Sequence, residues 1–407
     1  MFRLLLLILL TSTLASAQPA SDPAPAPPPP VDVKVGGYMQ VDARTFANDT
    51  GPHELTVRRL RFKAAGTALT YFRFNALVET AASKLQVEDA WVELAPRAEI
   101  ALRFGKDKAQ FGIDRLQSAT RLTFIERAFP TQLAPNRDIG LALRGDLLRG
   151  LVHYSAAIVD GVADNAVIEA ETDDDYEYDV HVLVSPFAAQ SRDASFGDLA
   201  IGGAATFGRT RGTLANPGLT ALRSGGQARI FRYAGGGTTD TLATTAVADG
   251  YRHRLTAHGY YFGGPIGLLA EYVADHEPVL LGGSHTLLRQ QAWQLAASAA
   301  LTPGDRPSYK RFVPKQPLDL EAGTWGAVEV AARYSELRLD DAAFTAGIAD
   351  SASSIRRARA ATLGLNWYFN QYVKLQLNYE ATVFRGGAGS GDRPTEHAIA
   401  ARAQVAI

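Results

Sequence analysis

Segments in which apolar and polar residues alternate with a period of two constrain the fold of this chain more than any other feature. In residues 100–105 and 139–144, Ile and Leu side chains share one face, while Arg103 and Arg144 lie on the other. An apolar face opposite a charged face is typical of a strand between lipid and water. The pattern therefore predicts a transmembrane strand on each side of the residues between these two segments.

The same alternation recurs along the chain, for example in residues 72–79, 176–184, 362–367, 373–380 and 399–407. Its connections are alternately short and long, as in outer-membrane barrels. We expect short turns at 66–67, 96–97, 145–149, 263–265 and 370–371, and long polar loops near 47–53, 107–136, 161–174, 210–249, 276–289, 339–355 and 386–394. The prediction is an all-β fold, a transmembrane antiparallel β-barrel of about sixteen strands. A strand-like stretch at 226–234 makes eighteen strands the alternative.

The N-terminus has the features of a secretory signal. Arg3 precedes an apolar run from Leu4 to Leu10, and Ala15-Ser16-Ala17 forms a cleavage motif. The run is much shorter than the roughly 20 residues of a spanning helix. We therefore predict a signal peptide at 1–17, a Pro/Ala-rich periplasmic linker at 18–30 and a barrel domain at 31–407. The chain has no cysteine, which excludes disulfides and thiol chemistry.

The connection between the two opening segments is too long for a hairpin turn and is rich in cations and aromatics. A loop of this kind can fold into the lumen and select ions. Guanidinium groups match phosphate oxygens well. The predicted anion pathway consists of Arg59, Arg61, Lys63, Arg73, Arg103 and Arg144 on strands, and Lys106, Lys108, Arg115, Arg121, Arg127 and Arg137 near or in the loop.

Other readings of these charges remain open. The cations can pair with carboxylates such as Glu79, Glu88, Asp89 and Glu126, which would leave a weakly selective pore. Residues 160–179 hold nine Asp or Glu residues and no Lys or Arg. This run lacks the ligand order of an EF-hand, so we interpret it as a solvated loop rather than a calcium site.

Catalytic and nucleic-acid functions find little support in the sequence. None of the common hydrolase, metalloprotease or nucleotide-binding motifs is present, and the eight histidines are scattered. The formal net charge is −1, and a secreted chain with balanced charge does not suggest a nucleic-acid partner. We predict no enzyme activity, no cofactor and no metal.

Four stretches resemble the phosphate-selective porin O and P family of Gram-negative outer membranes. They are 57–62 (VRRLRF), 102–115 (LRFGKDKAQFGIDR), 122–130 with 135–140 (LTFIERAFP and PNRDIG), and 293–313 with 325–337. Gln110 stands where the family has a proline before Phe-Gly. The resemblance implies a sixteen-stranded homotrimeric channel with a lumen narrowed by folded-in loops. It also implies that Lys310, Arg311 and Lys315, in an unusually long connection at 302–322, reach the pore.

The sequence thus predicts an outer-membrane porin that passively conducts small anions, with phosphate as the best single candidate. Its expected partners are outer-membrane lipid, lipopolysaccharide and the permeating anion. The alternatives are a general diffusion porin with weak selectivity, or a plugged barrel with a structural or adhesive role.

Overall fold

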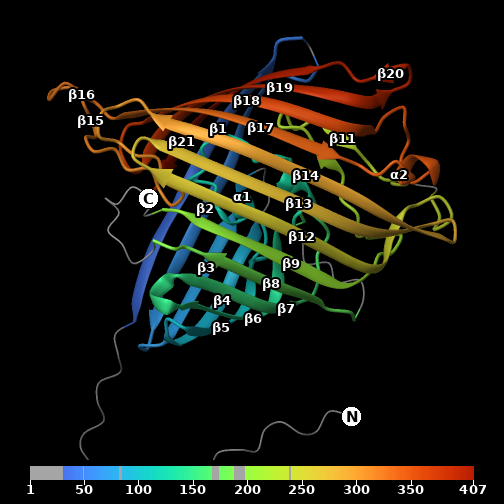
Figure 1. Cartoon of the computed structure of the whole chain (residues 1–407), viewed down its shortest axis with the longest axis horizontal. Coiled ribbons are helices and arrows are strands. Elements are labelled where there is room, and N and C mark those ends of the chain that lie inside the picture. Colours follow the sequence, from blue (N-terminus) through green and yellow to red (C-terminus); the bar gives the residue numbers. More distant parts are fainter. Residues whose placement is uncertain (1–30, 49, 82–84, 167–173, 188–197, 238–239) are drawn as a thin grey trace, which may run out of the picture.

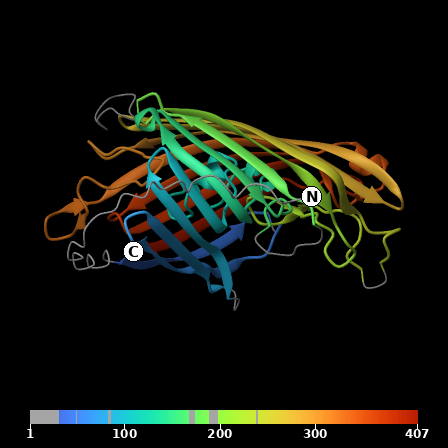
Figure 2. The same cartoon turned by 90° about the horizontal axis from the view of Figure 1, so that it is seen from below.

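Sixteen antiparallel strands form a closed β-barrel in the computed structural model (Figures 1 and 2). The structure describes residues 31–407 except 49, 82–84, 167–173, 188–197 and 238–239. The predicted signal peptide and linker lie outside these residues. None of the helices in the described part of the chain is long and apolar enough to cross a membrane.

The barrel strands follow the order of the chain. They are β1 (Asp32–Phe46), β2 (Glu54–Ala68), β3 (Phe72–Glu79), β4 (Gln86–Arg97), β5 (Ile100–Lys108), β6 (Arg137–Leu147), β7 (Val152–Val159), β8 (Glu177–Val184), β9 (Ala200–Arg211), β12 (Val247–Gly263), β13 (Ile266–Leu281), β14 (Ser284–Ala300), β17 (Ala327–Arg338), β18 (Ile355–Tyr368), β19 (Val373–Ala388) and β21 (Glu396–Ala406).

Pairing of the first strand with the last closes the barrel, with Tyr38 opposite Ala406 and Phe46 opposite Ala398. Closure leaves no sheet edge, so the backbone groups of the strands are hydrogen-bonded without water, as the hydrocarbon core of a membrane requires. In β19 the side chains at even positions from Lys374 to Thr382 are buried in the lumen, whereas Leu375, Leu377 and Val383 are exposed on the outside. The alternation that predicted a barrel is confirmed.

The two ends of the barrel differ in their connections. At the turn end lie both ends of the described chain and short turns such as 69–71, 98–99 and 264–265. At the loop end lie long connections, including 109–136, 212–246 and 339–354, the last of which holds the short helix α2 (Ala342–Thr345). One turn-end connection, 301–326, is also long and carries the two-residue strands β15 (Leu318–Asp319) and β16 (Thr324–Trp325), which project beyond the barrel (Figure 1).

Two sequence predictions about the loop end are wrong. The strand-like stretch at 226–234 does not add two strands to the barrel, because β10 (Leu222–Arg223) pairs only with β11 (Arg229–Phe231) inside a loop. The polar loop expected near 276–289 does not exist either. There β13 and β14 continue to a tight turn at Gly282-Gly283, where both glycines have a positive φ. The remaining extra strand, β20 (Gly391–Asp392), extends the β19 hairpin.

Candidate functional site: a basic cavity inside the barrel

The connection between β5 and β6, residues 109–136, folds into the barrel and crosses the lumen; we call it the inner loop. It contains the helix α1 (Ile113–Leu116) and the 3-10 turn η2 (Phe129–Leu133). Its apolar residues Phe111, Ile125 and Leu133 are almost completely buried. These buried apolar side chains form a short core that fixes the inner loop inside the polar lumen.

Hydrogen bonds attach the inner loop to the wall formed by β14, β17–β19, β21 and β1. Asn378 Oδ1 accepts a hydrogen bond from the backbone of Ile125 at 2.7 Å, and Lys374 Nζ donates to the Leu122 carbonyl at 2.9 Å. Gln404 and Gln40 donate to the carbonyls of Thr120 and Ala119. These four side chains thus satisfy loop carbonyl or amide groups that burial would otherwise leave unpaired.

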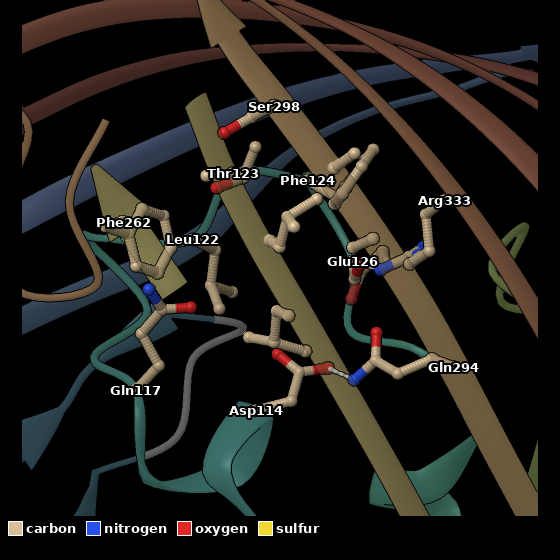
Figure 3. Close-up of a pocket in the computed structure, with 15 residues that line it drawn as sticks. Asp114, Gln117, Leu122, Thr123, Phe124, Glu126, Phe262, Gln294, Ser298 and Arg333 are labelled. Carbon is tan, nitrogen blue, oxygen red and sulfur yellow. Dashed lines mark hydrogen bonds between the residues drawn. The ribbon is translucent and has the colours of Figure 1, made fainter. Parts of the chain in front are cut away.

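The space between the inner loop and this wall is almost closed (Figure 3). The figure shows Asp114, Phe124 and Arg333 around a remaining cavity of about 40 Å³. Gln294 donates a hydrogen bond to Asp114 across it at 3.2 Å. A volume this small holds a water molecule or two. This cavity is too small for a hydrated ion.

A much larger cavity, about 700 Å³, lies on the opposite side of the inner loop, against strands β1–β6. We call it the basic cavity. Its lining includes three carboxylate side chains, Glu79, Glu88 and Asp89, and ten cationic side chains: Arg58, Arg59, Arg61, Lys63, Lys108, Arg115, Arg121, Arg127, Arg137 and Arg311.

A bulge in β2 brings two successive arginines into this cavity. Gln40 of β1 pairs with Arg59, but the next residue, Val41, pairs with Val57, so Arg58 is an extra residue on β2. A bulge of this kind turns the extra residue out of strict alternation. Strict alternation places only Arg59 on the lumen face. The sequence analysis therefore missed Arg58, although the Arg-Arg pair itself was visible.

A second bulge does the same for two acidic residues. Leu77 of β3 pairs with Asp89 and Val78 with Val87, which makes Glu88 the extra residue on β4. Glu88 accepts from Arg61 at 2.9 Å and from Arg137 at 2.6 Å. Arg61 also contacts Glu79, and Arg137 contacts Asp89. These two arginines are therefore neutralised by the acids beside them.

Seven of the cationic side chains in the lining form no ion pair with a carboxylate in the described part of the chain: Arg59, Lys63, Lys108, Arg115, Arg121, Arg127 and Arg311. Three of them help to build the inner loop. Lys108 donates to the carbonyls of residues 115–117, and Arg127 donates to those of Asp114 and Gln117. Arg115 donates to the Thr131 carbonyl. Carbonyl groups orient these side chains without supplying an opposite formal charge.

Crowding of like charges is also seen in the acid–base behaviour of the inner loop. Burial lowers the pKa of Arg115 to about 9, and the nearby Arg127 contributes to this shift. Burial lowers the pKa of Arg121 too, with a further contribution from Arg311. Guanidinium groups stay protonated at neutral pH. The cavity wall thus carries a positive electrostatic potential, which a bound small anion would lower.

Glu126 is the carboxylate of the inner loop that offsets the charges of nearby arginines. Burial by itself would raise the pKa of its carboxyl group, but Arg58, Arg402 and Arg59 hold that pKa well below its usual range. Arg58 lies 3.0 Å from Glu126, and Arg44 lies 3.4 Å from it. Of Arg44, Arg58 and Arg59, only Arg59 forms no ion pair with a carboxylate of the described residues, and it lines the cavity.

The other predicted pathway residues lie outside the lining. Arg73 and Arg103 both pair with Glu93, and Arg144 lies 3.8 Å from Asp107. Lys106 is buried and does not line the cavity. Of the three cations predicted from the 302–322 connection, Arg311 reaches the cavity, whereas Lys310 and Lys315 are exposed and do not line it.

The connection 301–326 enters the barrel from the turn end and contacts the inner loop. Tyr309 donates a hydrogen bond to the Ile113 carbonyl at 2.7 Å, and its ring stacks on Tyr260 with centroids 4.4 Å apart. Gln117 donates to the Tyr309 carbonyl at 2.9 Å. Two segments from opposite ends of the barrel therefore meet in the lumen and place Arg121 and Arg311 in the same lining.

The comparison with known families now decides what this barrel is. A model of the family described as phosphate-selective porin O and P matches residues 33–407. The chain belongs to this porin family. It is thus an outer-membrane channel protein by family and fold, which agrees with the resemblance noted in its sequence.

Solved porins share the fold at low sequence identity. The outer-membrane channel DcaP of Acinetobacter baumannii is 11% identical with a TM-score of 0.59, covering 93% of this chain and 97% of its own. OmpT of Vibrio cholerae is 12% identical with a TM-score of 0.57, covering 93% and 98%. An anion-selective porin of Comamonas acidovorans is 12% identical with a TM-score of 0.53, covering 93% and 100%. No curated protein matches the sequence.

Proposed function

We propose that this porin passively conducts small anions through the basic cavity, with phosphate as the preferred solute. The observation that carries the proposal is the excess of cations in the lining: ten cationic side chains stand against three carboxylates. A fixed positive potential in a narrow aqueous path lowers the electrostatic cost of an anion and raises that of a cation.

Phosphate suits the chemistry of this lining. Arg59, Arg121 and Arg311 present guanidinium groups that are free of carboxylate partners among the described residues, and guanidinium forks match phosphate oxygens. The solute would move down its gradient and exchange part of its hydration shell for arginine and lysine donors. No covalent step is involved. The family description, phosphate-selective porin, agrees with this choice.

Placement in the cell and assembly complete the proposal. We assign the turn end to the periplasm and the loop end to the exterior, since outer-membrane barrels have short periplasmic turns. We also propose a homotrimer in contact with lipid and lipopolysaccharide. One of the similar structures, OmpT of Vibrio cholerae, was described in a trimer form.

Planar-bilayer recording of the refolded protein tests the proposal. A KCl gradient should give a reversal potential of the sign expected for chloride permeation, and millimolar phosphate should reduce the chloride current. Anion selectivity without a phosphate effect would leave an anion channel of another preference. Cation-selective or unselective steps would refute the proposal and support a general diffusion pore. A folded barrel without any conductance would indicate a plugged, structural role.

A further inference from the structure

Three of the histidines that the channel function does not use converge on the inner wall, outside the lining of the basic cavity. His153 lies on β7, His181 on β8 and His258 on β12. His181 and His258 are buried, with 2% and 5% of their surfaces exposed. The three residues are far apart in the sequence, so only the curvature and register of the barrel bring them together.

The intervening strand, β9, makes this convergence possible. In the ladder, Ala204 lies next to His181, and Gly202 lies next to His258. These small side chains leave room for the two imidazole rings to meet across β9. The His181 and His258 rings stack with centroids 5.4 Å apart, and their Nε2 atoms are 3.3 Å apart.

This separation is the span of two ligands on one tetrahedral metal ion. With Zn–N bonds of about 2.0–2.1 Å and tetrahedral angles, two ligand nitrogens lie about 3.3–3.4 Å from each other. The His153 ring lies edge-on to that of His181, with centroids 6.1 Å apart. We propose that His153, His181 and His258 bind a divalent transition metal, with Zn²⁺ as the ion whose coordination the geometry matches best.

The outer nitrogens of two of these rings, those of His153 and His258, have partners of the kind found in metal sites. Asp146 Oδ1 lies 2.8 Å from His153 Nδ1, and Thr256 Oγ1 lies 3.4 Å from His258 Nδ1. A partner on Nδ1 fixes the ring and its tautomer and leaves Nε2 as the ligand, and a carboxylate in this role also increases ligand basicity. The His153 ring would have to turn towards the pair to add a third imidazole, which would leave the fourth position open.

Two buried polar atoms beside the histidines also lack partners. His181 Nδ1 and Ser155 Oγ have no hydrogen-bond partner, and Ser155 lies opposite His181 in the ladder. The cationic neighbour, Arg144, lies 3.8 Å from Asp107, which offsets its charge. The metal site goes beyond the proposed anion conduction and does not depend on it.

Zn²⁺ titration of the full-length, tag-free, refolded barrel against a chromophoric chelator tests the proposal. We expect one ion per chain, and Co²⁺ substitution should give the intense visible absorption of a tetrahedral site. His181→Gln and His258→Gln should each abolish this stoichiometric binding. Asp146→Asn should weaken it about 10- to 100-fold, as is typical when a partner of a ligating histidine is lost.

A second histidine pair provides the matched control. His253 and His276 face each other on the outer side of β12 and β13, with rings stacked at 4.2 Å. The double variant His253→Gln/His276→Gln should retain the ion. The proposal is overturned if the wild-type barrel binds no stoichiometric Zn²⁺, or if this control loses the ion while His181→Gln keeps it. Heat-modifiable gel migration establishes that each variant is folded before either result is read.

Discussion

Two arginine-rich regions of the lumen differ in whether their charges are matched. In the basic cavity, seven cationic side chains have no carboxylate partner among the described residues. On β12, Arg252 and Arg254 are fully buried and contact four carboxylates, Asp164, Glu177, Asp275 and Glu277; we call these six residues the matched cluster. Both regions look alike as arginine-bearing strands. In the matched cluster four carboxylates surround two arginines, so each guanidinium group is paired, whereas the basic cavity keeps unpaired cations beside a space of about 700 Å³.

The difference separates two uses of a guanidinium group inside a barrel. In the matched cluster, Arg254 donates to Glu177 at 2.8 Å and to Asp164 at 2.8 Å, which ties β12 to β8 and to the loop-end connection between β7 and β8. In the basic cavity, arginines are oriented by carbonyl and amide groups that do not cancel their charge. Under the proposed function, pairing with carboxylates, rather than the number of arginines, would determine where an anion passes.

The largest expected effect is on stability and lies in the matched cluster. Arg254→Met would leave Glu177 and Asp164 buried without this partner, and breaking a buried ion pair costs about 3–5 kcal/mol. Urea unfolding from lipid vesicles should show this loss of free energy. Arg73→Met, at a half-exposed ion pair with Glu93, should cost no more than about 1 kcal/mol. Equal losses in the two variants would show that burial does not distinguish the two regions.

Arg58 and Arg59, at the bulge in β2, should have the largest effect on selectivity. A unit charge about 6–8 Å from a permeating ion in water contributes about 0.5–0.7 kcal/mol, or about a two- to threefold change in relative permeability. The double variant Arg58→Gln/Arg59→Gln should therefore lower the anion-to-cation permeability ratio about five- to tenfold in a KCl gradient. Arg73→Gln, outside the lining, serves as the control and should leave the ratio unchanged. Equal ratios in both variants would contradict the assignment of the pathway.

Neutralising Glu126 should raise anion selectivity, whereas removing Arg58 and Arg59 should lower it. Glu126→Gln frees Arg58 from its carboxylate at 3.0 Å, so the anion-to-cation ratio should rise about two- to threefold. The measurement is again the reversal potential in a KCl gradient. An unchanged or lower ratio would mean that the Arg58 charge does not reach the permeating ion.

The same carboxylate gives a prediction about pH. The pKa of Glu126 in the folded barrel is held well below its usual range, so its contribution to stability is fully present above the ordinary glutamate pKa of about 4.3. It is lost only as pH falls through the lower folded value. Selectivity and stability should thus show no Glu126-dependent change from pH 8 to about pH 5. A titration in that interval, absent from Glu126→Gln, would contradict this.

The smallest effect is expected at the turn-end mouth. Arg311 is exposed on the connection 301–326, and the Debye length of about 8 Å at physiological salt screens an exposed charge. Arg311→Gln should therefore lower the anion-to-cation ratio less than twofold at 0.15 M salt and more at 0.01 M. Lys315→Gln, which is also exposed but outside the lining, should have no effect at either concentration.

The period-two alternation predicted the barrel because it reflects a physical requirement of the strands themselves. Outward-facing positions contact lipid and are therefore apolar, as the exposed Leu375 and Leu377 illustrate. Each strand has to meet this requirement separately, so the alternation appears in its own sequence. The inner loop was likewise visible from its length and composition. Length alone did not identify every loop, since the polar stretch at 276–289 is a continued hairpin.

Strand register and long-range pairing were decided only by the tertiary structure. Arg58 enters the cavity because of a bulge opposite Gln40, and Arg252 is neutralised by acids from other segments of the chain. Neither fact can be read from local alternation, because both depend on which residues of other strands lie alongside. The sequence thus determined that a barrel forms with an arginine-rich interior. The folded structure determined which of those arginines remain unmatched, since charge matching depends on distances between residues far apart in the chain.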